Sequence, residues 1–198
     1  MKSTNKILKA VISLSLTLSL LSGIKLPAAA GQTADNGYYD KLLSLGVLEE
    51  KDEYEFTGND AVSRGTFVKY AVKLSGLADS LVHDGVNNPF VDLRGDDKYY
   101  AEVLTAYKLG LITGISADTF GAENHIKLEE AAAVLIKVLG YKQQAQEIGG
   151  YPTGYLTVAK QIGLMKKITL PSNADLPVSD FLTIINNALE IEIMQLHS

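Results

Sequence analysis

Residues 110–141 read GLITGISADTFGAENHIKLEEAAAVLIKVLGY, which is an apolar turn, a polar loop and a run with helical spacing. From Leu128 to Leu139 apolar residues recur every three or four positions, which predicts a helix with one buried face. Gly140 follows this run and can end the helix. A single aromatic residue, Phe120, stands in the polar loop, and its role depends on whether the arrangement recurs.

The same arrangement does recur along the chain. The phrases LSLGVL, YKLGLI and KQIGLM each place a glycine at the end of a helical run, at Gly46, Gly110 and Gly163. Phe56 follows Gly46 by ten positions, and Phe120 follows Gly110 by ten positions. A large apolar residue at the same offset in two loops predicts a plug that docks each loop on the core.

Six segments with helical spacing form three pairs. They cover residues 38–48, 63–77, 98–112, 128–141, 154–165 and 179–191, and no convincing run of alternating residues indicates a strand. Gly-, Asn- and Pro-rich linkers at 83–92 and 146–154 separate the pairs. One helix pair cannot bury enough apolar surface alone, so we expect an all-α fold in which the three pairs pack on one another.

The N-terminus has the features of a secretory signal peptide. A lysine-rich start is followed by an apolar stretch at residues 10–24 and by small residues at Ala28 and Ala30, the pattern that a signal peptidase reads. The alternative is a membrane anchor, but the apolar stretch is shorter than the ~20 residues that a bilayer requires. We therefore predict cleavage after Ala30 and no membrane span in the mature chain.

Charge and cysteine content narrow the possible functions. Removing residues 1–30 takes away Lys2, Lys6, Lys9 and Lys25 and no acid, so 18 basic side chains fall to 14 against 23 acidic ones, a net charge of −9. Such an acidic chain disfavours nucleic acid as a partner. The chain has no cysteine, so an exported fold must rest on its apolar core rather than on disulfides.

The order of helix, Gly-Leu/Ile turn, Phe-containing loop and helix resembles the S-layer homology repeat. The resemblance is greatest in the second copy. There PFVD, which ends at Asp92, resembles the family's Phe-x-Asp opening, and Tyr100-Ala101 resembles its Trp-Ala step. GLITG resembles the family's Gly-Ile-x-x-Gly turn. GGYPTGYLTVAKQIGLMKKI resembles the third repeat of long surface proteins of Gram-positive anaerobes. The resemblance places three degenerate repeats, at 38–82, 88–145 and 149–195, behind the signal peptide.

The resemblance implies a pseudo-threefold arrangement around a central helical bundle. It also implies an exported anchoring module at the cell wall or surface layer of a Gram-positive-type bacterium. Such a module binds secondary cell-wall polysaccharide on peptidoglycan without a covalent bond, and this polymer often carries pyruvyl groups. No cofactor and no catalytic activity are implied. Other surface-layer subunits, or a C-terminal cargo region, are the further partners that the family suggests.

In this family an Ile-Thr-Arg-Ala-Glu motif opens the second helix of a repeat. The Thr caps the helix, the Glu completes a capping box, and the Arg offers a planar fork of donors to a carboxylate. At the Thr, Arg and Glu positions the three copies have Ser63, Arg64 and Thr66; Lys127, Leu128 and Glu130; and Pro177, Val178 and Asp180. We therefore expect Ser63 to cap its helix, Glu130 to keep its half of the box, and at most one site to have its arginine.

The resemblance makes Arg64 the principal candidate for binding a carboxylate, with Ser63 beside it; the alternative is a solvated arginine in a first helical turn. Tyr100 is a candidate for stacking on a sugar, or a tyrosine at the edge of the core. Asp92 matches the family's Asp, or bonds its own backbone in a turn. Lys127 is a candidate to replace the missing arginine as a point charge, or a solvated lysine.

Other kinds of site fit the sequence poorly. The three histidines have no metal-binding spacing, and DLRGDD at residues 92–97 lacks the spacing of a calcium loop. Glu129 and Glu130 are adjacent on a helix, so they do not face each other as a glycosidase pair must. Gly110 and Gly114 are expected to serve the turn through positive φ. The alternative to anchoring is a scaffold or assembly domain whose degenerate repeats no longer bind glycan.

Overall fold

The computed structural model describes residues 37–50, 56, 61–82 and 87–194. The predicted signal peptide lies outside these residues, as do two of the three histidines, His83 and His197. No helix within the described residues is both long enough and apolar enough to cross a membrane.

The described part of the chain is helical, which confirms the predicted all-α class. Its helices are α2 (Tyr38–Ser44), α4 (Arg64–Leu74), α5 (Tyr100–Lys108), α6 (Leu128–Val138), α7 (Lys142–Glu147), α8 (Thr153–Gln161) and α9 (Val178–Glu190), with a short 3-10 turn at Ala78–Ser80. All six predicted segments are present. The short α7 was not predicted because its sequence, KQQAQE, buries one residue, Ala145, and so shows no apolar period.

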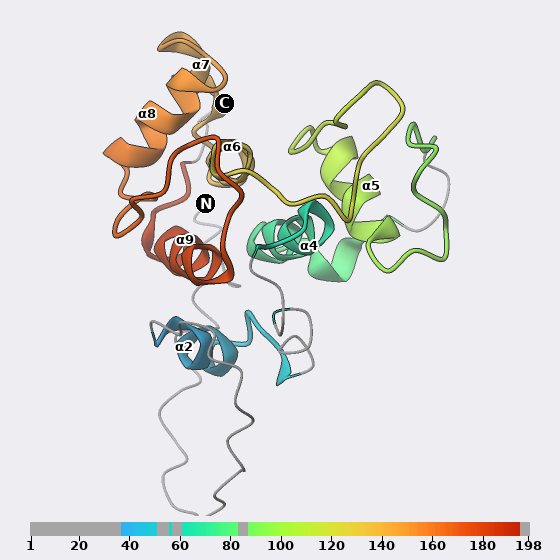
Figure 1. The fold of residues 1–198 in the computed structure, drawn as a ribbon, viewed down its shortest axis with the longest axis horizontal. Helices are drawn as coiled ribbons and strands as arrows, with labels where there is room; N and C mark the ends of the chain where they lie inside the picture. Colours follow the sequence, from blue (N-terminus) through green and yellow to red (C-terminus); the bar gives the residue numbers. More distant parts are fainter. Residues whose placement is uncertain (1–36, 51–55, 57–60, 83–86, 195–198) are drawn as a thin grey trace, which may run out of the picture.

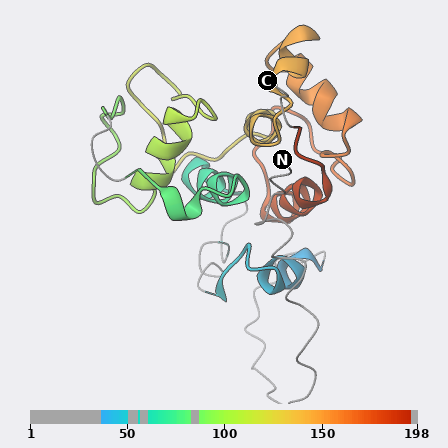
Figure 2. The same cartoon turned by 180° about the vertical axis from the view of Figure 1, so that it is seen from behind.

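Helices α4, α6 and α9 lie in the middle of the molecule, and α2, α5 and α8 lie outside them (Figures 1 and 2). The strongest packing runs between copies of the repeat rather than within them. Helix α5 packs on α4, α8 packs on α6, and α2 packs on α9, so each outer helix covers the inner helix of another copy. The expectation that the three pairs pack on one another is confirmed, and the repeats interlock in a closed cycle.

A ring of three backbone hydrogen bonds joins the segments that precede the inner helices. The N–H of Val62 donates to the carbonyl of Leu176 at 2.9 Å, that of Leu176 to Ile126 at 2.8 Å, and that of Ile126 to Val62 at 3.0 Å. This ring brings the N-terminal ends of α4, α6 and α9 together. The pseudo-threefold symmetry and the exact bounds of the repeats stay predictions.

The inner helices begin as the sequence indicates. Ser63 caps α4, because its Oγ accepts a hydrogen bond from the N–H of Thr66 at 3.1 Å. Glu130 keeps its half of the capping box on α6, because its Oε2 accepts from the N–H of Lys127 at 3.0 Å. Pro177 is the residue before α9, where its missing N–H costs nothing.

Both predicted aromatic plugs are buried. Phe56 is packed between Tyr70 of α4 and Phe181 of α9, with ring centroids 6.1 Å and 5.4 Å away. Phe120 is fully buried and its ring lies 5.5 Å from that of Phe90. The plug hypothesis is confirmed for both loops, and Phe56 also ties the first copy to the third.

The two turn glycines of the second copy act for different reasons. Gly110 has φ 68°, as expected for a residue that ends a helix in the left-handed region. Gly114 does not have positive φ, so that expectation was wrong for it. A Cβ at Gly114 would lie 2.5 Å from the carbonyl oxygens of Ser116 and Thr119, so this glycine is needed for space.

Candidate functional site: a groove beside Arg64

A groove with a volume of about 510 Å³ is lined by segments from all three copies of the repeat. Arg64 and Val68 come from α4, residues 111–115 form the turn after α5, and α6 forms the floor. Tyr151 and Tyr155 come from the start of the third copy. Helix α6 lies between α8 and the region around α5 (Figures 1 and 2). It therefore stands between the lining residues of the third copy and those of the turn after α5.

Arg64 is held in this groove by three hydrogen bonds. Its Nε donates to the carbonyl of Phe120 at 3.2 Å, and its Nη2 donates to the carbonyl of Thr113 at 3.1 Å. Its Nη1 forms a 3.2 Å ion pair with Oε1 of Glu130, and the guanidinium lies 5.0 Å from the centre of the Phe120 ring. Only 8% of Arg64 is exposed, so the alternative of a solvated arginine is wrong.

Glu130 connects this arginine to the start of α6. One carboxylate oxygen accepts from Arg64 and the other from the backbone N–H of Lys127. The carboxylate therefore caps a helix and compensates the guanidinium at the same time. The Arg64–Glu130 pair as a whole carries no net charge.

Lys137 is the third charged residue of the groove. Its Nζ donates to the carbonyl of Leu111 at 2.9 Å, at the turn after α5. Burial lowers the pKa of the Lys137 ammonium, and the positive charge of Lys142 lowers it further. With the Arg64–Glu130 pair neutral, Lys137 gives the groove a net charge of one positive unit.

Two tyrosines form one wall of the groove. The rings of Tyr151 and Tyr155 meet edge to face, with centroids 6.4 Å apart, and the Tyr151 hydroxyl donates to Oε1 of Glu129 at 3.5 Å. Burial raises the pKa of Tyr151 to about 12, with help from the negative charges of Glu129 and Glu130. Since 55% of Tyr151 is nevertheless exposed, an apolar ring face is open to a ligand.

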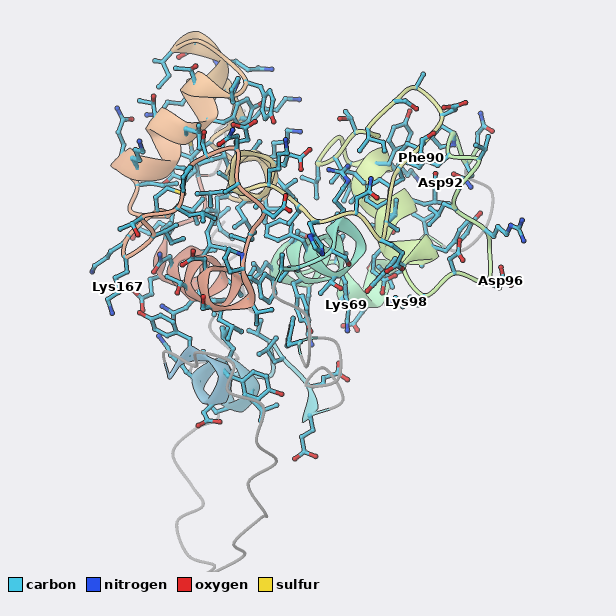
Figure 3. All side chains as sticks on the ribbon, viewed as in Figure 1. Lys69, Phe90, Asp92, Asp96, Lys98 and Lys167 are labelled. Carbon is cyan, nitrogen blue, oxygen red and sulfur yellow. The ribbon has the colours of Figure 1, made fainter. Side chains whose placement is uncertain are left out.

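The other predicted site residues lie elsewhere. Asp92 accepts hydrogen bonds from the N–H groups of Phe120 and Gly121, both at 2.8 Å, so it closes the loop that carries the plug and does not bond its own turn. It lies beside Phe90 near α5 (Figure 3). None of the four candidates Asp92, Ser63, Tyr100 and Lys127 lines the groove.

The positions equivalent to Arg64 are filled by core residues. Leu128 is completely buried and Val178 is 6% exposed. In these two copies the position of the arginine is therefore part of the packed interior. Arg64, the charged residue at this position in the first copy, instead lines a groove.

Residues 89–132 match the family model described as S-layer homology domain. This segment of the chain is similar to the S-layer homology domain. The match begins just before Phe90 and ends in the second turn of α6, so the matched S-layer homology segment includes α5, the plug loop and Glu130. Arg64, Lys137 and the two tyrosines flank it on either side.

Three relatives have names that place them in the wall or at the surface. They are the middle cell wall protein of Brevibacillus brevis (23% identical over 78% of this chain), the cell surface protein of Thermoanaerobacter kivui (22% over 98%) and the surface-layer 125 kDa protein of Lysinibacillus sphaericus (24% over 89%). The aligned regions cover 14%, 26% and 16% of those proteins. The chain therefore spans a small part of the relatives that it matches.

The described residues contain no group of three or more acidic, histidine or cysteine side chains that could hold a metal ion. Asp97 in the DLRGDD segment instead accepts a hydrogen bond from the N–H of Arg94. Sequence reasoning missed Lys137, Tyr151 and Tyr155. Of these, only the Tyr-Pro-Thr-Gly-Tyr phrase gave a signal, as part of the resemblance of the third copy.

Proposed function

We propose that this chain holds an exported protein at the bacterial cell surface by binding an anionic wall polysaccharide in the groove beside Arg64. The observation that carries the proposal is the groove itself, in which a fixed arginine, a lysine and two tyrosines converge around the segment that matches the S-layer homology domain. The names of the three relatives support a surface location.

The properties of the groove suit a sugar. Its volume falls within the ~300–1,000 Å³ typical of ligand sites, and it combines aliphatic walls with a few polar groups. A sugar ring has an apolar face that can pack on Tyr151 and hydroxyl groups that can accept from the guanidinium. Three of the five N–H groups of Arg64 are used within the protein, which leaves donors for a ligand.

A second candidate function is assembly without glycan binding. The observation that favours it is the engagement of Arg64, whose hydrogen bonds join α4 to the plug loop and to α6 as a structural residue would. The burial of Leu128 agrees with it, because this copy has no arginine at the equivalent position. On this alternative, the copies pack against each other or other subunits and the groove holds no sugar.

Sedimentation with peptidoglycan sacculi separates the two functions. The mature chain, residues 31–198, is mixed with sacculi that retain their secondary polymer and with sacculi from which the polymer has been stripped. Glycan anchoring predicts pelleting that requires the polymer. If the chain stays in the supernatant with both preparations while remaining folded by circular dichroism, anchoring is wrong and assembly is the better explanation.

A further inference from the structure

The three charged residues of the groove have unequal roles. Arg64 and Glu130 form an ion pair at 3.2 Å and neutralise each other, whereas Lys137 takes part in none of the ion pairs among the described residues. We propose that Lys137, rather than Arg64, selects a sugar that carries a carboxylate, and that Arg64 is the positioning residue that shapes the groove. This inference rests on the proposed binding of wall polysaccharide.

The equivalent position in the other two copies supports this role. Lys73, Lys137 and Asn187 each lie nine positions after the first residue of their inner helix, and each contacts the turn of its own copy. Lys73 pairs with Oε1 of Glu49 at 3.4 Å, so its charge is compensated. Asn187 donates to the carbonyls of Leu164 and Lys166 at 3.0 Å and 2.8 Å and is neutral.

The second copy therefore differs from the others in the way that anion binding requires. Its turn presents the carbonyl of Leu111 to the ammonium instead of a carboxylate. One N–H group of Lys137 is used in this bond, which leaves two N–H groups on a residue that lines the groove. Because the ammonium is partly buried, its field is screened less than that of a surface lysine.

The surroundings define the class of ligand. A groove with a net charge of one positive unit is matched by a sugar that carries one negative charge. Tyr151 offers an exposed ring face to such a sugar, and its hydroxyl is held by Glu129. A second negative charge on the same sugar would find no second unpaired cation among the residues that line the groove, so a monoanionic residue is favoured.

The test compares Lys137→Met with Lys142→Met. Lys142 is exposed and does not line the groove. Lys142→Met removes one positive charge from the same region of the chain, so it is the matched control. Binding of isolated, polymer-bearing sacculi is measured at low and at high salt. We expect Lys137→Met to weaken binding about tenfold or more, and Lys142→Met to change it by no more than about twofold.

Two further variants separate charge from packing. Lys137→Arg keeps the charge and should retain most of the binding. Glu130→Gln keeps an oxygen for the N–H of Lys127 but frees the charge of Arg64, so it should strengthen binding. Equal binding by Lys137→Met and Lys142→Met overturns the inference, as does weaker binding by Glu130→Gln while its unfolding curve matches that of the wild type.

The nature of the anion is tested with the isolated polymer. Its carboxylates are coupled to a neutral amine, which leaves phosphate groups unchanged, and both forms compete with sacculi for the protein. A carboxylated sugar predicts that the coupled polymer competes at least about tenfold less well. Equal competition by both forms refutes a carboxylate ligand. Failure of the wild type to bind any polymer-bearing sacculi refutes the proposed function itself.

Discussion

Replacing Arg64 should cost stability as well as binding. Arg64→Met keeps the aliphatic stem of the side chain but removes all three of its hydrogen bonds within the protein. The carbonyl of Phe120 then loses its charged donor in a buried region, and the carbonyl of Thr113, an exposed residue, loses its donor where water can replace it. This substitution therefore tests whether the guanidinium is a structural part of the groove.

The magnitude follows from the partners that remain. A buried acceptor left without its donor costs about 1–3 kcal/mol, which applies to the carbonyl of Phe120. Water can reach the exposed Thr113, so the loss of its bond should add less than about 1 kcal/mol. The side chain of Glu130 is 30% exposed and keeps the N–H of Lys127, so water and this bond offset much of its loss, and we assign it no more than about 1 kcal/mol. The expected loss in the free energy of unfolding is about 3 kcal/mol.

Urea unfolding followed by far-ultraviolet circular dichroism measures this loss. With a slope of about 2 kcal/mol per molar urea, the midpoint should fall by about 1.5 M. Arg94→Met is the control, because Arg94 is the other arginine of the chain and is exposed; it should change stability by less than about 0.5 kcal/mol. If Arg64→Met loses less than about 1 kcal/mol, the guanidinium is not a structural clamp.

Three other substitutions test separate parts of the structure. Gly65→Ala places a Cβ 2.2 Å from the buried ring of Tyr99, so it should destabilise the fold by about 1–3 kcal/mol in urea unfolding; an unchanged midpoint would show that the ring can move away. Leu128→Arg restores the arginine of the family motif at a completely buried position, so it should lower the thermal midpoint and create no second sugar site, as equilibrium binding stoichiometry would reveal. The pKa of Tyr151 is raised to about 12, so the folded protein keeps this proton above the ordinary pKa of about 10 and loses stability as the pH rises from there toward 12. Tyr151→Phe should therefore remove the latest-titrating tyrosine from the ultraviolet absorbance titration, and removal of one that titrates near pH 10 would refute the assignment.

The helices could be predicted from the sequence because the spacing of apolar residues and the glycines that end helices are local features of the chain. The period of apolar residues located all six main segments, and Gly110 marked the end of α5. The plug role of Phe120 followed from its recurrence at the offset of Phe56. The cyclic packing of each outer helix on another copy was beyond such reasoning, because no local signal states which of three similar inner helices an outer helix will cover.

The site was predicted in part, because a motif position does not determine which groups surround it. Arg64 was identified from its place in the motif, and it does lie in a groove. The resemblance gave the aromatic role to Tyr100, whereas the buried tyrosine is its neighbour Tyr99, whose ring packs on Gly65 and whose hydroxyl bonds Thr66 at 2.7 Å. In sequence, Gly65 and Thr66 look like decay of the motif, but in the structure they make room for Tyr99.

Lys137 shows why the charge of a groove has to be judged from the structure. In the sequence it is one lysine in an apolar helix, which is usually a solvated residue. Its importance is seen only by comparison with the other copies. In the first copy Glu49 neutralises the equivalent lysine, Lys73, and in the third copy Asn187 stands in place of a lysine. If the groove binds the wall polymer as proposed, linking several chains in a layer would add their contacts and raise the overall affinity above that of one chain. Contacts between chains would therefore strengthen the proposed binding at the Lys137 groove, and would replace it only if the groove holds no sugar.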